Sequence, residues 1–341
     1  MSQLFKVCMM LGLFAFCWQG NFAQAASGDY QYSSYGNTGN VTSVTSYGIN
    51  LMGGGTDVDE AMLWMAKKAN QGDFVILRTS GSDGYNQYLY DLAQSNNAKL
   101  DSVETIVLNN KYASSDSFVL DKVRNAEAVF FAGGDQFNYV DYIKNTALED
   151  VLNQHIQNNV PIGGTSAGLA IMGQFVYDAK NGSVYSDEAL VNPNNRYMTF
   201  TKDFLNNTYL ASVITDTHFE QRDRMGRFIG FMARNVSDGW TNQSKGIAVN
   251  EQTALLVEQD GTAKVVAQPG GSKQSVYMAK TTASPTSSIG KPLTIKNVEV
   301  VKLRPGNTFN LQTWNSSNGY FYKLSAQNGT LSSTSGSIYG N

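Results

Sequence analysis

The sequence predicts an α/β protein with three layers, in which helices cover both faces of a mostly parallel sheet and a β-rich part follows at the C-terminal end. Short apolar runs without polar alternation recur through the first half of the chain, as in strands buried on both faces. Helix-length segments separate these runs, which is the pattern of a parallel sheet. After about residue 251 the helical segments give way to strand-like runs joined by glycine-containing turns.

The expected elements alternate regularly along the chain. An apolar stripe of Ala61, Met62, Met65 and Ala66 predicts the first helix, and the apolar run at 128–132 predicts a buried strand. The expected strands are residues 48–52, 74–78, 103–108, 128–132 and the run that ends at residue 162. The expected helices are residues 57–69, 85–95, 117–125, 138–157 (as one helix or two) and 167–172.

Glycine- and polar-rich turns follow these strands, after residues 52, 80, 132 and 162. The carboxyl ends of parallel strands meet at one edge of a sheet, and ligands bind in the crevice outside that edge. The sequence therefore predicts one functional crevice, which these turns surround.

Strand-like runs dominate the C-terminal part. They are residues 253–257, 263–266, 275–279, 293–303 and 320–324. We expect them to extend the same domain, which would cover residues 47–327. Residues 26–46 and 328–341 are rich in Ser, Gly and other small or polar residues, and we expect a flexible leader and a flexible tail there.

Residues 1–25 have the pattern of a signal peptide. Lys6 precedes a short apolar stretch at 7–18, and cleavage after the Ala-Gln-Ala at 23–25 would start the mature chain near Ala26. The stretch is too short for a membrane anchor, since spanning a bilayer takes about 20 apolar residues. Lipid attachment at Cys17 is disfavoured because bulky phenylalanines precede it. We therefore expect a secreted or periplasmic protein with no membrane attachment after cleavage.

Composition argues against several classes of function. The formal net charge is −3 and only 16% of residues are charged, so neither nucleic acid nor an anionic membrane surface is an expected partner. Both cysteines, Cys8 and Cys17, lie in the signal segment, so the mature chain would have no disulfide and no thiol nucleophile. The two histidines lack metal-binding spacing, and we expect no metal or organic cofactor.

The clearest candidate for chemistry is Ser166, in the stretch Gly-Gly-Thr-Ser-Ala-Gly at 163–168. A G-x-S-x-G turn between a strand and a helix exposes the serine hydroxyl above the sheet and brings backbone N–H groups near a developing oxyanion. An ordinary glycine-rich loop is the alternative. The position of the turn after a buried strand favours a nucleophile.

A nucleophilic serine needs a base, and the chain has two histidines. His155 falls in an amphipathic helical segment, where we expect a helix-surface residue. His218 follows the apolar run at 210–214 and is the expected base, at the end of a strand. Either Asp216 or Glu251 could orient its imidazole, and the spacing of the residues does not separate them.

Three arginines follow the expected base closely: Arg222, Arg224 and Arg227. A solvated helix face paired with neighbouring acids is one interpretation. However, such a cluster is unusual in a chain with so little charge, and guanidinium groups bind carboxylates through two parallel hydrogen bonds. The cluster therefore favours a substrate that carries a carboxylate.

Four motifs occur in order within about residues 46–310. They are Phe-Ala-Gly-Gly-Asp-Gln at 131–136, Gly-Gly-Thr-Ser-Ala-Gly at 163–168, Asp-Thr-His-Phe at 216–219 with the three arginines, and the weaker Gly-Ile-Ala-Val-Asn-Glu-Gln-Thr-Ala at 246–254. Together they resemble the cyanophycinase and aspartyl dipeptidase family of serine peptidases, which has a class I glutamine-amidotransferase-like fold. The all-arginine set resembles the cyanophycinase branch.

This resemblance implies Ser166 as nucleophile, His218 as base and Glu251 as orienting acid, without a cofactor. It also implies an oxyanion site formed by the backbone around Gly134 and Ala167. The implied substrate contacts are Gln136, Asp216, Arg222, Arg224 and Arg227.

The implied reaction is hydrolysis of aspartyl-type peptide or isopeptide bonds through an acyl-enzyme, for example of multi-L-arginyl-poly-L-aspartate to β-Asp-Arg. Two departures leave the substrate open. Thr217 stands where the cyanophycinase branch tends to carry Gln, and the polar stretch at 177–207 is longer than usual. Whether the chain forms a homodimer is also open.

Two other functions remain as alternatives. An α/β-hydrolase-type esterase also uses G-x-S-x-G, but its histidine follows its acid, and here no histidine follows His218. A non-enzymatic binding protein on the same scaffold would keep Ser166 without activity. The complete set of Ser, His, Glu and Arg residues argues against it.

Overall fold

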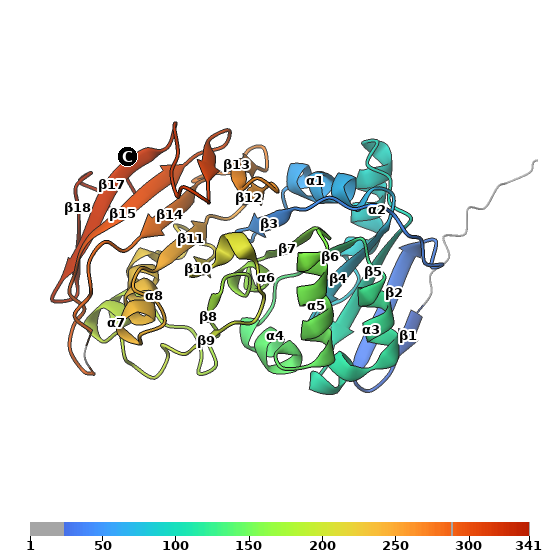
Figure 1. Cartoon of the computed structure of the whole chain (residues 1–341), viewed down its shortest axis with the longest axis horizontal. Coiled ribbons are helices and arrows are strands. Elements are labelled where there is room, and N and C mark those ends of the chain that lie inside the picture. Colours follow the sequence, from blue (N-terminus) through green and yellow to red (C-terminus); the bar gives the residue numbers. More distant parts are fainter. Residues whose placement is uncertain (1–23, 288, 341) are drawn as a thin grey trace, which may run out of the picture.

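The computed structural model of the chain describes residues 24–287 and 289–340 (Figure 1). The expected signal peptide therefore lies outside the described residues up to residue 23. Within the described ranges, the strands form two sheets that meet near the middle of the molecule.

The first sheet has ten strands and a parallel centre. In spatial order they are β1 (Gln24–Ala26), β2 (Tyr30–Gly36), β5 (Ser102–Leu108), β4 (Asp73–Arg78), β6 (Ala128–Phe131), β7 (Ile162–Thr165), β3 (Ile49–Met52), β12 (Thr253–Val257), β13 (Thr262–Ala267) and β16 (Thr308–Asn310). The run from β5 to β3 is parallel throughout. The strands on either side of this run pair antiparallel.

Helices cover both faces of the first sheet. Phe74 and Ile76 of β4 pack against α1 (Asp59–Ala69) and α2 (Tyr85–Ser95). Val75 and Leu77 face the opposite side, where the helices are α3 (Ser117–Arg124), α4 (Gln136–Ile143) and α5 (Ala147–Gln157). Because successive side chains of a strand point to opposite faces, the unbroken apolar run of β4 supplies both cores. The expected three-layer α/β class is confirmed, and it is consistent with a class I glutamine-amidotransferase-like fold.

The second sheet has eight strands and forms the left half of Figure 1. In spatial order they are β18 (Thr330–Ser333), β17 (Tyr320–Gln327), β15 (Ile295–Leu303), β14 (Val276–Lys280), β11 (Lys245–Val249), β10 (Val213–Asp216), β8 (Phe175–Tyr177) and β9 (Phe200–Lys202). One face of this sheet packs against α7 (Ser186–Val191) and α8 (Met225–Ser237). The other face shares a core with the first sheet. The β-rich C-terminal part is thus divided between the two sheets.

Two segments that were expected to be flexible contain strands. Strand β2 pairs with β5 over seven residues, and Tyr30 and Tyr32 pack against Phe118. Strand β18 pairs with β17, and Tyr339 near the end of the chain packs against Phe219. The Ser- and Gly-rich composition suggested flexibility, but the tyrosine rings in these segments bury apolar area against the two cores.

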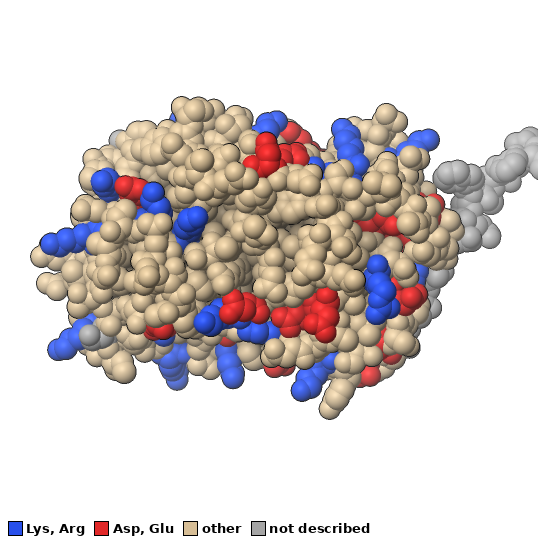
Figure 2. All heavy atoms as spheres, in the orientation of Figure 1, with Lys and Arg blue, Asp and Glu red and all other residues tan. Residues whose placement is uncertain are grey.

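The visible surface in Figure 2 is mostly uncharged. Charged side chains of both signs are scattered over it, and they form no continuous basic region on this face. In the part of the chain that the structure describes, every helix is too short or too polar to cross a bilayer.

The carboxyl end of β7 lies where the two sheets meet. Ser166 follows β7 and precedes the short helix α6 (Ala167–Ala170). The elements β7 and α6 lie near the centre of Figure 1. The hydroxyl of Thr215 in β10 donates to the carbonyl of Leu169 at 2.9 Å, which joins α6 to the second sheet. The residue after β7 is thereby placed within reach of residues that follow β10 and β11.

Candidate active site

Ser166 occupies a strained turn. Its backbone has φ 53° and ψ −116°, a conformation that residues other than glycine rarely adopt and that clusters at functional sites. The N–H of Ser166 donates to the carbonyl of Met52 at 3.1 Å, which fixes the turn to β3. The small residue at 168 is required, because a Cβ there would lie 2.1 Å from the carbonyl oxygen of Phe131.

Ser166, His218 and Glu251 form a hydrogen-bonded series. The Oγ of Ser166 lies 2.7 Å from Nε2 of His218, and Nδ1 of His218 lies 2.7 Å from Oε1 of Glu251. A carboxylate can only accept hydrogen bonds, so Glu251 keeps the imidazole proton on Nδ1. Nε2 is then free to accept a hydrogen bond from the serine hydroxyl. The geometry therefore selects Glu251, and not Asp216, as the partner of the imidazole.

The glycine turn after β3 positions both partners of the serine. The N–H of His218 donates to the carbonyl of Gly53 at 2.8 Å, and the N–H of Gln252 donates to that of Gly54 at 2.8 Å. Gly54 has φ +96°, and a Cβ at this position would lie 2.3 Å from Cε1 of His218. The sequence predicted that this turn lies at the crevice, but not that its backbone holds the imidazole of His218 in place.

The environment of His218 favours the neutral imidazole. Burial is the main cause that lowers its pKa, and the charges of Arg222 and Arg224 lower it further. The hydrogen bond and negative charge of Glu251 act in the opposite direction. The net pKa lies below the ordinary value of 6.5, so the base is unprotonated at neutral pH.

Asp216 and Arg227 form a buried pair. Nε of Arg227 donates to Oδ2 of Asp216 at 2.8 Å, and Nη2 donates to Oδ1 at 2.5 Å. Both side chains are at least 96% buried, and the guanidinium also lies over the rings of Tyr177 and Phe231. Arg227 and Asp216 thus satisfy each other in the interior, and their expected direct contact with a substrate stays a prediction.

The other two arginines are more available. Nη1 of Arg224 donates to the carbonyl of Thr217 at 2.8 Å and to its hydroxyl at 3.2 Å, and it lies 3.5 Å from Asp216 Oδ1. Burial is the main cause that lowers the pKa of Arg224, to about 10, so it stays charged at neutral pH. Arg222 is exposed, and no carboxylate in the described ranges forms an ion pair with it.

A cavity of about 180 Å³ lies among the arginines. Its lining comprises Ser183, Val184, Tyr185, Ser186, Arg222, Arg224 and Arg227. The hydroxyl of Ser186 donates to the carbonyl of Asp223 and accepts from the N–H of Arg227 at 3.3 Å. The 177–207 stretch thus supplies one wall of the cavity and is tied to the arginine segment.

Backbone donors lie close to Ser166. Ala167 is the first residue of α6, so its N–H has no acceptor within the helix. On the other side, a Cβ at Gly133 would lie 3.5 Å from Cβ of Ser166, and the next residue, Gly134, has φ +153°. The geometry thus brings Gly133 beside the serine, where an oxyanion site would lie, whereas a Cβ at Gly134 would meet Ser80 and Thr79.

Gln136 and His155 each contact a backbone carbonyl. Nε2 of Gln136, at the start of α4, donates to the carbonyl of Tyr177 at 3.3 Å. His155 is buried in α5, not exposed on its surface as expected, and its Nε2 lies 2.5 Å from the carbonyl of Val123. It lies on the face of the amphipathic helix that packs into the core, and this burial lowers its pKa.

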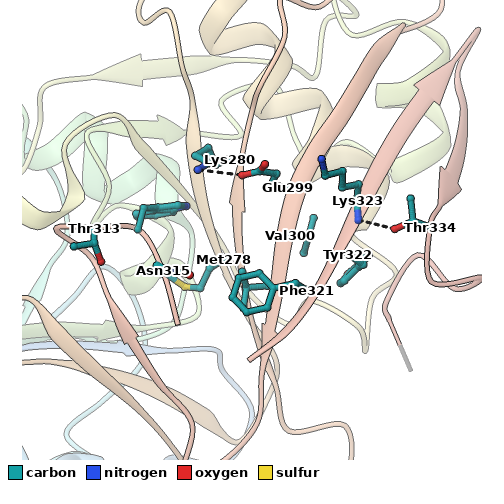
Figure 3. Close-up of a pocket in the computed structure, with 12 residues that line it drawn as sticks. Met278, Lys280, Glu299, Val300, Thr313, Asn315, Phe321, Tyr322, Lys323 and Thr334 are labelled. Atoms are coloured by element: carbon teal, nitrogen blue, oxygen red, sulfur yellow. Dashed lines mark hydrogen bonds and ion pairs between the residues drawn. The ribbon is translucent and has the colours of Figure 1, made fainter. Parts of the chain in front are cut away.

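A larger cavity, of about 640 Å³, lies on the second sheet (Figure 3). Its rim carries the ion pair between Lys280 and Glu299, 3.0 Å apart, and the hydrogen bond from the N–H of Lys323 to Thr334. Met278 and Phe321 contribute apolar surface. Neither Ser166 nor a histidine lines this cavity.

Comparisons with known proteins point to the same part of the chain. The model of Peptidase family S51 matches residues 51–265, which include Ser166, His218 and Glu251. Over 214 residues the chain is 27% identical to a cyanophycinase of Trichormus variabilis, a match that covers 62% of this chain and 66% of that protein. It is 25% identical over 212 residues to a cyanophycinase of Synechococcus elongatus, covering 62% and 61%.

The matched region spans slightly less than two thirds of the length of these relatives. Among solved structures, a peptidase from an acI-B1 Actinobacterium is similar with a TM-score of 0.49 and 15% identity, covering 78% of this chain and 98% of that one.

Proposed function

The chain belongs to peptidase family S51, and on that premise we propose that it is a serine peptidase that forms an acyl-enzyme on Ser166. The observation that carries the proposal is the hydrogen-bonded series from Ser166 through His218 to Glu251, with 2.7 Å at each step. A nucleophile, its base and the group that orients the base are the three parts that acyl transfer requires.

In the acylation step, Oγ of Ser166 attacks the carbonyl carbon of the scissile bond while Nε2 of His218 takes the hydroxyl proton. Glu251 stabilises the imidazolium through Nδ1–H. The N–H groups around Ala167 and Gly134 stabilise the oxyanion of the tetrahedral intermediate. The intermediate then collapses as His218 returns the proton to the leaving amine, which departs and leaves an ester on Ser166.

In the deacylation step, a water molecule replaces the amine. His218 takes a proton from this water as its oxygen attacks the ester carbonyl, and the second tetrahedral intermediate expels Oγ of Ser166. The proton returns to Oγ, and the product leaves with a new carboxyl group. Neutral His218 is needed at the start of both steps, in agreement with its lowered pKa.

The arginine cavity supports an aspartyl-type substrate. Arg222 and Arg224 contribute two cations, while the charge of Arg227 is balanced by Asp216. A substrate carboxylate would therefore enter a site with unbalanced positive charge, where charge-assisted hydrogen bonds are strongest. We infer a cyanophycinase-like preference for a β-linked aspartyl unit, whose carboxylate is bound by Arg222 and Arg224.

Product analysis tests this proposal. The purified protein is incubated with cyanophycin, with isoaspartyl peptides and with matched α-aspartyl peptides, and the products are identified by mass spectrometry. Release of β-Asp-Arg from cyanophycin, with little cleavage of the α-aspartyl peptides, supports the assignment. Cleavage of α-aspartyl peptides alone would contradict the cyanophycinase-like specificity while leaving the serine mechanism in place.

We also propose that the protein is exported. The support is the pattern of residues 1–25, with Lys6, the apolar stretch and the Ala-Gln-Ala site. Sequencing of the N-terminus of the mature protein tests this proposal, since export predicts a start at Ala26. A full-length chain that stays in the cytoplasm would contradict it.

A further inference from the structure

Asp223 lies between Arg222 and Arg224 in the sequence but is bound elsewhere. Its Oδ1 accepts a 2.6 Å hydrogen bond from the hydroxyl of Tyr339. No arginine in the described residues lies within ion-pair distance of this carboxylate; the pairs that Arg224 and Arg227 form are both with Asp216. The carboxylate nearest in sequence to Arg222 and Arg224 therefore forms an ion pair with neither of them.

The hydroxyl of Tyr339 is held in place from several sides. It accepts a hydrogen bond from the N–H of Met225, the first residue of α8, at 3.3 Å. The carbonyl of Tyr339 accepts from the hydroxyl of Tyr277 in β14 at 3.0 Å. Its ring packs against Phe219, with 5.9 Å between centroids. The end of the chain is thus fixed against the segment that carries His218 and the arginines.

This contact comes from the part of the chain outside the family match. The match ends at residue 265, before β14, β15, β17 and Tyr339. The Asp223 side of the contact lies inside the match. The part of the chain after the family match therefore contacts the segment inside the match that carries the arginines.

We propose that Tyr339 is a positioning residue that keeps the carboxylate of Asp223 away from Arg222 and Arg224, so that both guanidinium groups stay available to the carboxylate of a substrate. The proposal rests on the proposed function of the arginine cavity. It makes the C-terminal part of the second sheet a determinant of substrate affinity.

The physical reason is competition within the chain. A carboxylate one residue away from an arginine has a high effective concentration there, because it is tethered by a short connection. If Asp223 were released, it would compete with any carboxylate in solution for Arg222. Burial raises the pKa of Tyr339, so its hydroxyl stays protonated and keeps donating to Asp223 over the working pH range.

Calorimetric binding of succinate, used as a small dicarboxylate probe, tests the proposal on the full-length protein. Tyr339→Phe removes the hydroxyl and retains the ring, and it should weaken succinate binding about three- to tenfold, the range expected from the loss of one hydrogen bond. Adding Asp223→Asn should restore binding to within twofold of the unchanged protein, because the competitor no longer carries a charge. Tyr112→Phe, at a tyrosine that is 69% exposed in the 3-10 helix Lys111–Ser115, is the matched control and should change nothing.

A purely structural role of Tyr339 gives a different pattern. In that case the double variant would bind as weakly as Tyr339→Phe, which would overturn the proposal. Unchanged binding in Tyr339→Phe, or no binding of succinate to the unchanged protein, would overturn it as well.

If Tyr339→Phe does not fold, Asp223→Asn alone still decides, since the proposal requires it to bind succinate at least as tightly as the unchanged protein, and weaker binding would overturn it. Labelling of Ser166 by a fluorophosphonate is measured in parallel. Its failure would count against the serine mechanism, whereas the succinate result reports on the arginines.

Discussion

Arg227 binds Asp216 through two hydrogen bonds in the protein interior, directly behind the loop that carries His218. This pairing divides the arginine cluster by role. Arg227 supports the loop from within, while Arg222 and Arg224 border the cavity with their charges incompletely balanced. The predictions below follow from that division and from the hydrogen-bonded series at Ser166.

Breaking the buried pair should destabilise the protein. Arg227→Met removes both short hydrogen bonds to the buried Asp216 and leaves it only the more distant Arg224, 3.5 Å away. Loss of one partner costs up to about 3–5 kcal/mol in comparable buried pairs. Urea unfolding measures the loss in free energy of unfolding. Arg222→Gln, in the same cluster but exposed, is the control and should change stability by less than about 0.5 kcal/mol. Equal stability of Arg227→Met and the unchanged protein would contradict the structural role.

Loss of Arg222 should weaken substrates that carry a carboxylate. We expect Arg222→Gln to lower kcat/KM on an acidic peptide about tenfold or more, the loss of a charge-assisted hydrogen bond. A peptide with that carboxylate amidated should be cleaved poorly by the unchanged protein and little worse by the variant. If the unchanged protein cleaves both peptides equally well, the cavity does not bind a carboxylate.

The pH profile should report His218. The base must be neutral, so kcat/KM falls as the pH drops through its pKa, which burial places below the ordinary 6.5. Glu251 raises this pKa, so Glu251→Gln should move the acid limb to lower pH while reducing the rate. Arg222 lowers it, so Arg222→Gln should move the limb to higher pH. Limbs that do not move, or that move in the reverse directions, would count against the assignment of the base.

The turn after β3 should be essential to catalysis. In Gly54→Ala the added methyl group would lie only 2.3 Å from Cε1 of His218, and the backbone φ of residue 54 is +96°. We expect kcat to fall at least 100-fold, because displacement of a catalytic group by about 1 Å has costs of that size. Gly84→Ala, where an added Cβ meets no atom within 4 Å, is the matched control. Near-normal activity in Gly54→Ala would mean that the imidazole is not held as described.

Much of the fold followed from local patterns. The strands and helices around the parallel centre lie close to their expected bounds, because buried runs such as 128–132 depend on apolar sequence alone. Strand β2 was missed because its stability comes from pairing with β5 and from rings packed on Phe118, which no local pattern reveals. The division into two sheets likewise depends on which distant strands pair.

The site was predictable where chemistry leaves few choices. With one serine at a strand-to-helix turn and two histidines, Ser166 and His218 could be named from the sequence. The choice between Asp216 and Glu251 needed coordinates, because both follow strands. The burial of Arg227 also required coordinates, because it depends on the ring of Tyr177, 50 residues earlier, and on that of Phe231, one helix turn later.

The central claim is that Ser166 is the nucleophile, and covalent labelling tests it most directly. The protein is treated with a fluorophosphonate, and the modified residue is located by mass spectrometry of peptides. We expect a single label on Ser166, lost in Ser166→Ala together with all peptidase activity, while the thermal unfolding temperature stays within a few degrees. Ser80→Ala, at an exposed serine of the same sheet edge, should keep both label and activity. Peptidase activity that survives in Ser166→Ala would contradict the account.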